Sequence, residues 1–142
     1  MRPAEPSIPL QKEPVVHALI IDDSRTMRAI IARIVKELGF ETSEAENGQE
    51  ALDLLEDGLV PDICLIDWNM PLMDGYTFVT RVRQDPKWRN VTLMMVTTES
   101  EHSQIVRALA AGAHEYLIKP FTPDSIVEKL ELLGLAAQEI PA

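Results

Sequence analysis

From residue 15 onward, the apolar positions along the chain follow two alternating patterns. Short, nearly continuous apolar runs, such as residues 15–21, are typical of strands that are buried on both faces of a sheet. Further runs predict strands at residues 40–45, 63–67, 93–97 and 116–118. The run at 40–45 is less apolar than the others, which suits a strand nearer the edge of the sheet.

The segments between these runs carry apolar residues at spacings of three and four, which is typical of amphipathic helices. The first helix is predicted between Ser24, which can cap a helix, and Gly39, which can end one. The last is predicted to open with Thr122 as its cap and Pro123 at its first position. The apolar residues at these spacings predict five helices, at residues 27–38, 49–57, 76–82, 105–110 and 123–133.

Five strands that alternate with five helices indicate an α/β fold, a doubly wound parallel sheet with helices on both faces. We assign this domain to residues 15–133, and 142 residues suit one such core. Residues 1–14 contain four prolines and no helical or strand period, so we expect a flexible, proline-rich extension outside the fold. Residues 134–142 form a tail that is too short for a second domain.

The composition limits which partners and which cellular location we expect. The net charge is −10 and no cluster of Lys and Arg occurs, which argues against nucleic acid or an anionic membrane as a direct partner. No stretch resembles a signal peptide or is long enough to span a membrane. A single cysteine, Cys64, excludes an internal disulfide framework. We therefore expect a soluble, cytoplasmic protein.

Polar residues with a shared chemistry follow several of the predicted strands. Asp22 and Asp23 end the first, Asp67 ends the third, Thr97 ends the fourth, and Lys119 ends the fifth. The carboxyl ends of the strands of a doubly wound sheet meet at one crevice. We therefore expect these side chains to lie close together at that crevice. Three carboxylates repel one another unless a cation lies among them, and oxygen ligands favour Mg²⁺ or Mn²⁺ over zinc.

Such a site suits phosphoryl chemistry. A carboxylate such as that of Asp67 can act as a nucleophile toward a phosphoryl group and form an aspartyl-phosphate. The transfer requires positioning and charge neutralisation more than acid–base catalysis. Lys119 offers a compact cation for the phosphoryl oxygens, and Thr97 offers a hydroxyl donor.

Four ordered segments resemble the response-regulator receiver domain over residues 15–133. They are IDDS at residues 21–24, DWNMPLMDG at 67–75, MVTT at 95–98 and YLIKPF at 116–121. Further matches at residues 24–28 and 36–40 make the chain most similar to the chemotaxis members of the family. The resemblance implies a flavodoxin-like fold with strand order 2-1-3-4-5, for which a chemotaxis member of this family is itself the standard example.

The resemblance also implies roles for the site residues. Asp67 is the phosphoacceptor. Mg²⁺ is bound by the carboxylates of Asp23 and Asp67 and the backbone carbonyl of Asn69, and by Asp22 through a water molecule. Lys119 contacts the phosphoryl group, and the peptide bond that follows it, to Pro120, is expected to be cis.

Three more positions are assigned from the same resemblance. Thr97 moves to hydrogen-bond the phosphoryl group, and Tyr116 swings inward as the paired aromatic switch. Asn69 and Glu99 occupy the positions that tune loss of the phosphoryl group to water. Both residues match those of chemotaxis regulators, which implies relatively rapid self-dephosphorylation.

These assignments imply a single-domain response regulator of a two-component, chemotaxis-type system, phosphorylated by a sensor histidine kinase. It is a signalling switch, not an enzyme, and catalyses only its own phosphotransfer and autodephosphorylation. Residues 100–133 include the output surface that is usual in the family, which we expect a separate protein such as the flagellar motor switch to read. A phosphorelay intermediate or a phosphate sink is the alternative within this class.

Two other classes are disfavoured by particular residues. A dehalogenase-like phosphatase uses an aspartyl nucleophile and requires a second aspartate two residues after it. This chain has Asn69 at that position. A flavodoxin-like flavin carrier needs a phosphate-binding loop after the first strand, where Asp22 and Asp23 would repel a phosphate.

Overall fold

Five parallel strands form one sheet in the order β2-β1-β3-β4-β5. The computed structural model describes residues 15–136, and its strands are β1 (His17–Ile21), β2 (Glu41–Ala45), β3 (Ile63–Ile66), β4 (Thr92–Thr97) and β5 (Glu115–Ile118). The order confirms the fold implied by the resemblance, and β2 lies at an edge, as its weaker apolar run predicted. Because β1 and β3 are neighbours in the middle of the sheet, the chain reverses its winding direction between them.

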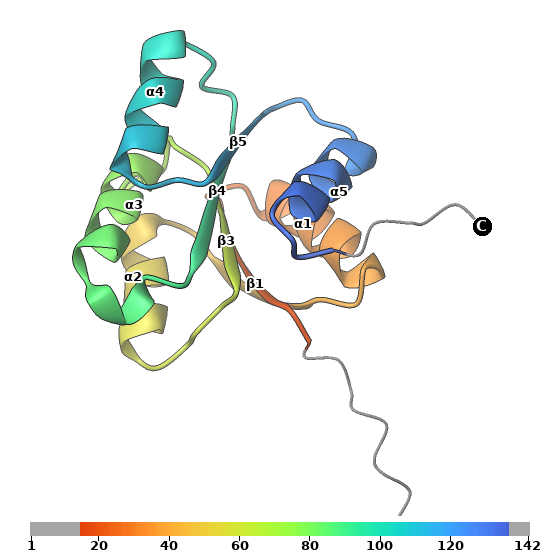
Figure 1. Cartoon of the computed structure of the whole chain (residues 1–142), viewed down its shortest axis with the longest axis horizontal. Coiled ribbons are helices and arrows are strands. Elements are labelled where there is room, and N and C mark those ends of the chain that lie inside the picture. Colours follow the sequence, from red (N-terminus) through yellow and green to blue (C-terminus); the bar gives the residue numbers. More distant parts are fainter. Residues whose placement is uncertain (1–14, 137–142) are drawn as a thin grey trace, which may run out of the picture.

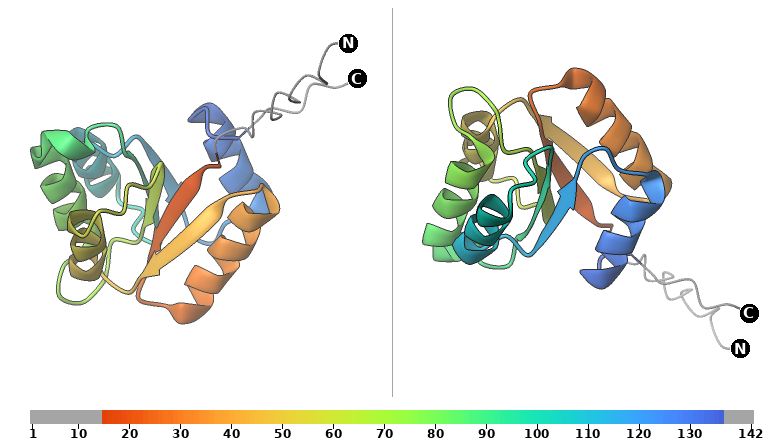
Figure 2. Two further views of the ribbon diagram at one scale, coloured as in Figure 1. Left: turned by 90° about the horizontal axis from the view of Figure 1, so that it is seen from below. Right: turned by 90° about the horizontal axis from the view of Figure 1, so that it is seen from above.

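Five helices cover the two faces of the sheet. They are α1 (Arg25–Glu37), α2 (Gly48–Glu56), α3 (Gly75–Gln84), α4 (His102–Ala111) and α5 (Pro123–Leu132). Helices α1 and α5 pack on one face, and α2, α3 and α4 pack on the other (Figure 1, Figure 2). The molecule thus has three layers, with the carboxyl ends of the strands at one edge.

The sheet separates two hydrophobic cores. Alternate side chains of β1 point to opposite faces, as the period of a strand requires. Ala18 and Ile20 join the core beneath α1 and α5. Leu19 and Ile21 join the core beneath α2, α3 and α4. All four are fully buried, which explains why the first apolar run is continuous and not alternating.

The capping residues predicted for the first and last helices are confirmed. The Ser24 hydroxyl accepts a hydrogen bond from the Met27 N–H, and the Thr122 hydroxyl accepts one from the Ser125 N–H. Gly39 follows α1 with φ of +91°, in the left-handed region that glycine tolerates.

Several predicted boundaries are wrong by one to three residues, and the largest error is at α4, which begins at His102 and not at residue 105. Strand β1 begins at His17, and Val15, which the prediction included, is 51% exposed. Strand β3 ends at Ile66, so Asp67 is the first residue after the strand and not its last. A short 3₁₀ helix, η1 (Pro86–Trp88), was not predicted.

Two predictions concern the ends of the chain. The proline-rich extension assigned to residues 1–14 lies outside the described residues, as does most of the predicted tail at 134–142. Within residues 15–136, no helix is both long and apolar enough to cross a bilayer.

Candidate functional site

The strand register brings the predicted site residues to one edge. Ile21 of β1 pairs with Ile66 of β3, so Asp22 and Asp67 each follow the paired position directly. The Asp67 N–H donates to the Ile21 carbonyl at 2.9 Å, which continues the ladder by one bond beyond the strands. On the far side of β3, the Lys119 N–H donates to the Thr97 carbonyl at 2.8 Å. The sheet itself therefore sets the positions of these four residues.

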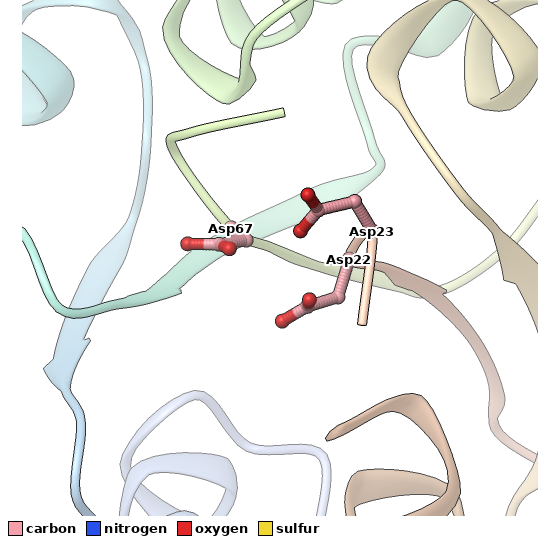
Figure 3. A group of neighbouring side chains, drawn as sticks. All are labelled: Asp22, Asp23 and Asp67. Carbon is pink, nitrogen blue, oxygen red and sulfur yellow. The ribbon is translucent and has the colours of Figure 1, made fainter. Parts of the chain in front are cut away.

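The three predicted carboxylates converge. Asp22, Asp23 and Asp67 each present an oxygen, and these oxygens all lie within 4.8 Å of one another (Figure 3). Asp22 is buried and Asp23 is exposed, so the cluster opens toward solvent on one side. A set of hard oxygen donors at this spacing fits Mg²⁺ or Mn²⁺, because a divalent cation offsets the mutual repulsion of the carboxylates.

Lys119 supplies a cation on the buried side of the cluster. Its ammonium nitrogen lies 2.7 Å from Oδ2 of Asp22 and 3.6 Å from Oδ2 of Asp67. The side chain is only 11% exposed, so solvent screens these interactions weakly. The Lys119–Pro120 peptide bond is cis, as predicted.

The Asp67 carboxylate is held in one orientation. Its Oδ1 accepts a hydrogen bond of 2.8 Å from the Trp68 N–H, while Oδ2 faces Lys119. Burial raises the pKa of Asp67 above its ordinary value, and the neighbouring charge of Asp22 raises this pKa further. The Thr97 hydroxyl, the Lys119 ammonium and the Trp68 N–H act on the pKa in the opposite direction.

The loop after Asp67 folds back tightly on the strand end. The Gly75 N–H donates to the Trp68 carbonyl at 2.8 Å. A Cβ at Gly75 would overlap the Asp67 carbonyl oxygen and would lie 2.9 Å from Cγ2 of Ile66. Asp74 caps the following helix by accepting from the Thr77 N–H. A glycine is thus required here because the start of α3 touches the backbone of the candidate phosphoacceptor.

Glu99 connects three residues at the rim of the site. Its carboxylate accepts a hydrogen bond of 3.3 Å from the Asn69 side-chain amide. Its backbone carbonyl accepts one of 2.6 Å from the Tyr116 hydroxyl, and its N–H donates to the Thr97 hydroxyl at 3.3 Å. The Tyr116 ring is 8% exposed and lies inward, and burial raises the pKa of its hydroxyl to about 12, with Glu99 and then Asp67 adding to the shift. Asn69, Thr97 and Tyr116, which the sequence singled out, therefore each contact Glu99.

Arg28 belongs to the site's support and was missed in the sequence. Its guanidinium donates to the Asp22 carbonyl at 2.7 Å and to the Glu44 carboxylate at 3.0 Å, and only 8% of the residue is exposed. Ile31 and Ala32, three and four residues later, lie on the buried face of α1. The sequence could have indicated this role, because Arg28 falls on the same helix face as these apolar residues. An arginine on the buried face of a helix is expected to have hydrogen-bonded partners.

Comparisons with known proteins give one consistent answer. The family model "Response regulator receiver domain" matches residues 18–131. "Chemotaxis protein CheY1" of Helicobacter pylori is 41% identical over 116 residues, covering 81% of this chain and 94% of that protein. "Chemotaxis protein CheY homolog" of Campylobacter jejuni is 43% identical over 123 residues, covering 85% and 95%. The solved structure of Vibrio cholerae chemotaxis protein CheY4 is similar with a TM-score of 0.78 at 30% identity, covering 84% of this chain and 98% of that one.

Proposed function

The chain belongs to the response-regulator receiver family, and on this premise we propose that it is a single-domain, CheY-like response regulator that is phosphorylated on Asp67. Its receiver domain spans residues 15–133, and it works in the cytoplasm. A sensor histidine kinase is the phosphodonor, and a separate protein reads the phosphorylated state. The named relatives act in chemotaxis, which makes the flagellar motor switch the first partner to test.

One observation carries the proposal: three carboxylates and one buried ammonium converge at the carboxyl ends of three strands of the parallel sheet, β1, β3 and β5. Asp23 and Asp67 would hold Mg²⁺ (or Mn²⁺) through their carboxylates, Asn69 through its backbone carbonyl, and Asp22 through a water molecule. When bound, the ion neutralises charge on the carboxylates and on the phosphoryl oxygens. Lys119 supplies the remaining positive charge from the opposite side.

In the transfer, a carboxylate oxygen of Asp67 forms a bond to phosphorus while the bond between phosphorus and the histidine nitrogen of the donor breaks. The Trp68 N–H fixes the orientation of the carboxylate before the donor arrives. Lys119 then binds a phosphoryl oxygen, and the Thr97 hydroxyl binds another. Asn69 and Glu99 lie at the rim, where water must enter to hydrolyse the aspartyl-phosphate, so they tune its lifetime.

The output surface follows from the same contacts. Thr97 and Tyr116 both bond Glu99, which lies three residues before α4 begins at His102. A phosphoryl group that engages the Thr97 hydroxyl therefore changes the bonds that hold the segment leading into α4. The face formed by α4, β5 and α5 exposes Val106, Leu109 and Ile118, each between 40% and 49% accessible, as an apolar surface for a partner.

A binding experiment tests the switch. Beryllofluoride, a phosphoryl mimic, is added with Mg²⁺ to the native protein and to Asp67→Asn, and each is titrated into the purified motor-switch protein of the same organism. We expect beryllofluoride to tighten binding of the native protein alone. Equal binding with and without beryllofluoride would contradict the motor-switch output, and phosphoryl transfer from Asp67 to a histidine phosphotransfer domain would then favour the relay role.

A further inference from the structure

Trp68 contacts the phosphoacceptor with its backbone and a second aromatic residue with its side chain. Its N–H donates to Oδ1 of Asp67 at 2.8 Å. Its indole is 7% exposed and stacks on the ring of Tyr76, with centroids 5.5 Å apart and planes inclined by 16°. Tyr76 is the second residue of α3, so the stack joins the end of β3 to the start of that helix.

Tyr76 is also contacted from α4. The guanidinium carbon of Arg107 lies 4.5 Å from the centroid of the Tyr76 ring, a cation–π distance. The Arg107 guanidinium is oriented by a hydrogen bond of 2.9 Å to the Gln104 side chain, one turn earlier on α4. Tyr76 is half-buried and Arg107 is exposed. A series of three contacting side chains, Arg107, Tyr76 and Trp68, therefore runs from the surface of α4 to the residue that follows Asp67.

We propose that Tyr76 and Arg107 are positioning residues for phosphorylation of Asp67. This inference rests on the proposed function of the site. The stack holds the Trp68 backbone, whose N–H holds Oδ1 of Asp67 and leaves Oδ2 facing Lys119. Release of the stack lets the carboxylate sample other orientations, so fewer encounters with a phosphodonor find it aligned.

The same contacts form a second route between the site and the output surface. The first route runs through Glu99 into the segment that leads into α4. The second reaches the middle of α4 at Arg107 through two aromatic rings. Coupling between two sites is reciprocal, so a partner that moves Arg107 on α4 also changes how readily Asp67 accepts a phosphoryl group.

The test measures the rate of Asp67 labelling by acetyl phosphate at saturating Mg²⁺, read as intact mass. We expect Arg107→Ala and Tyr76→Leu each to slow labelling by about threefold, since one aromatic or cation–π contact changes an equilibrium by roughly this factor. The double variant should be no slower than Tyr76→Leu, because Arg107 acts through the Tyr76 ring, which that change has already removed. Tyr76→Phe retains the ring face and should restore the native rate, which a loss of general stability would not predict.

Lys87 provides a matched control, because its ammonium also lies 4.5 Å from an aromatic centroid, that of Trp88. Lys87→Ala removes a cation–π pair of equal length away from Asp67 and should label at the native rate. Native labelling rates in Arg107→Ala and Tyr76→Leu, or equal slowing in Lys87→Ala, would overturn the inference while leaving the proposed function intact. A native protein that is not labelled would overturn both.

Discussion

Lys119 and Asp22 form a buried ion pair, with the ammonium nitrogen 2.7 Å from Oδ2 and side chains that are 11% and 2% exposed. Asp22 also accepts the Ser24 N–H at 2.8 Å, so both of its oxygens are bonded. The pair joins the end of β1 to the end of β5 across the strands that lie between them. It therefore contributes to the fold and to the charge balance of the candidate site together.

Replacing Lys119 should be costly when no divalent cation is present. Lys119→Met leaves Asp22 buried without a cation, and we expect a loss of about 3 kcal/mol in the free energy of unfolding, as for other broken buried pairs. Mg²⁺ should recover part of this loss. Urea unfolding with chelator and with Mg²⁺ measures both effects.

A second lysine serves as the control for that measurement. Lys129 lies 3.0 Å from the Glu115 carboxylate, with side chains that are 29% and 25% exposed. Lys129→Met should cost less, and Mg²⁺ should not change its effect. Equal losses in the two variants, both insensitive to Mg²⁺, would show that Lys119 has no special link to the carboxylate cluster.

Asn69 should set the lifetime of the aspartyl-phosphate. Asn69→Leu removes the amide that bonds Glu99 and places an apolar side chain where water must enter. We expect loss of the phosphoryl group to slow by about tenfold, the rate equivalent of one polar contact of about 1.4 kcal/mol. The decay of phosphorylated mass after removal of the donor measures it, with exposed Asn90→Leu as the control. Persistence of the native phosphoprotein for hours with Mg²⁺ would contradict rapid self-dephosphorylation.

Gly75 should tolerate no side chain. A Cβ there would overlap the Asp67 carbonyl oxygen, so Gly75→Ala must displace either α3 or the backbone of Asp67. We expect the free energy of unfolding to fall by about 2 kcal/mol, as for other overpacked positions. Denaturant unfolding checks this, and Thr77→Ala at an exposed position of the same helix is the comparison. An unfolding midpoint of Gly75→Ala equal to that of the native protein would refute the close approach.

His114 should make stability depend on pH in the mildly acidic range. Its Nδ1 accepts the Leu93 N–H at 3.0 Å, which requires that this nitrogen carry no proton. Partial desolvation, and then the Arg83 guanidinium 3.4 Å away, lower the pKa of His114 below its ordinary value of 6.5. Between the lowered pKa and 6.5 the unfolded chain binds more protons, so falling pH favours unfolding.

The contribution of His114 is therefore complete above pH 6.5 and is lost as the pH falls through the lowered value. His114→Asn keeps an acceptor and cannot titrate. We expect the advantage of the native protein over this variant, measured as the free energy of urea unfolding, to shrink as the pH falls through that range. A difference that stays constant, or grows as the pH falls, would contradict the lowered pKa.

Much of the fold was predictable because its signals are periodic and local. The continuous runs of β1 and β3 indicated strands buried on both faces, and Ser24 and Thr122 marked helix starts by their capping chemistry. The 3₁₀ helix at Pro86–Trp88 was missed because three residues are too few to establish a period.

The site was predictable only in part. The convergence of Asp22, Asp67 and Lys119 follows from their places after parallel strands, which the sequence reveals. The contact between Tyr76 and Arg107 joins two helices whose rotation about their axes no local pattern fixes. Such contacts depend on how α3 and α4 pack, and so they emerge only in the folded structure.

The phosphoacceptor is tested most directly by mass. The native protein, Asp67→Asn and the control Asp53→Asn, an exposed carboxylate on α2, are each incubated with acetyl phosphate and Mg²⁺ before intact mass is measured. We predict that the native protein and Asp53→Asn each gain one phosphoryl group, that Asp67→Asn gains none, and that a chelator prevents the gain. No gain in the native protein, or an equal gain in Asp67→Asn, would contradict the assignment of Asp67.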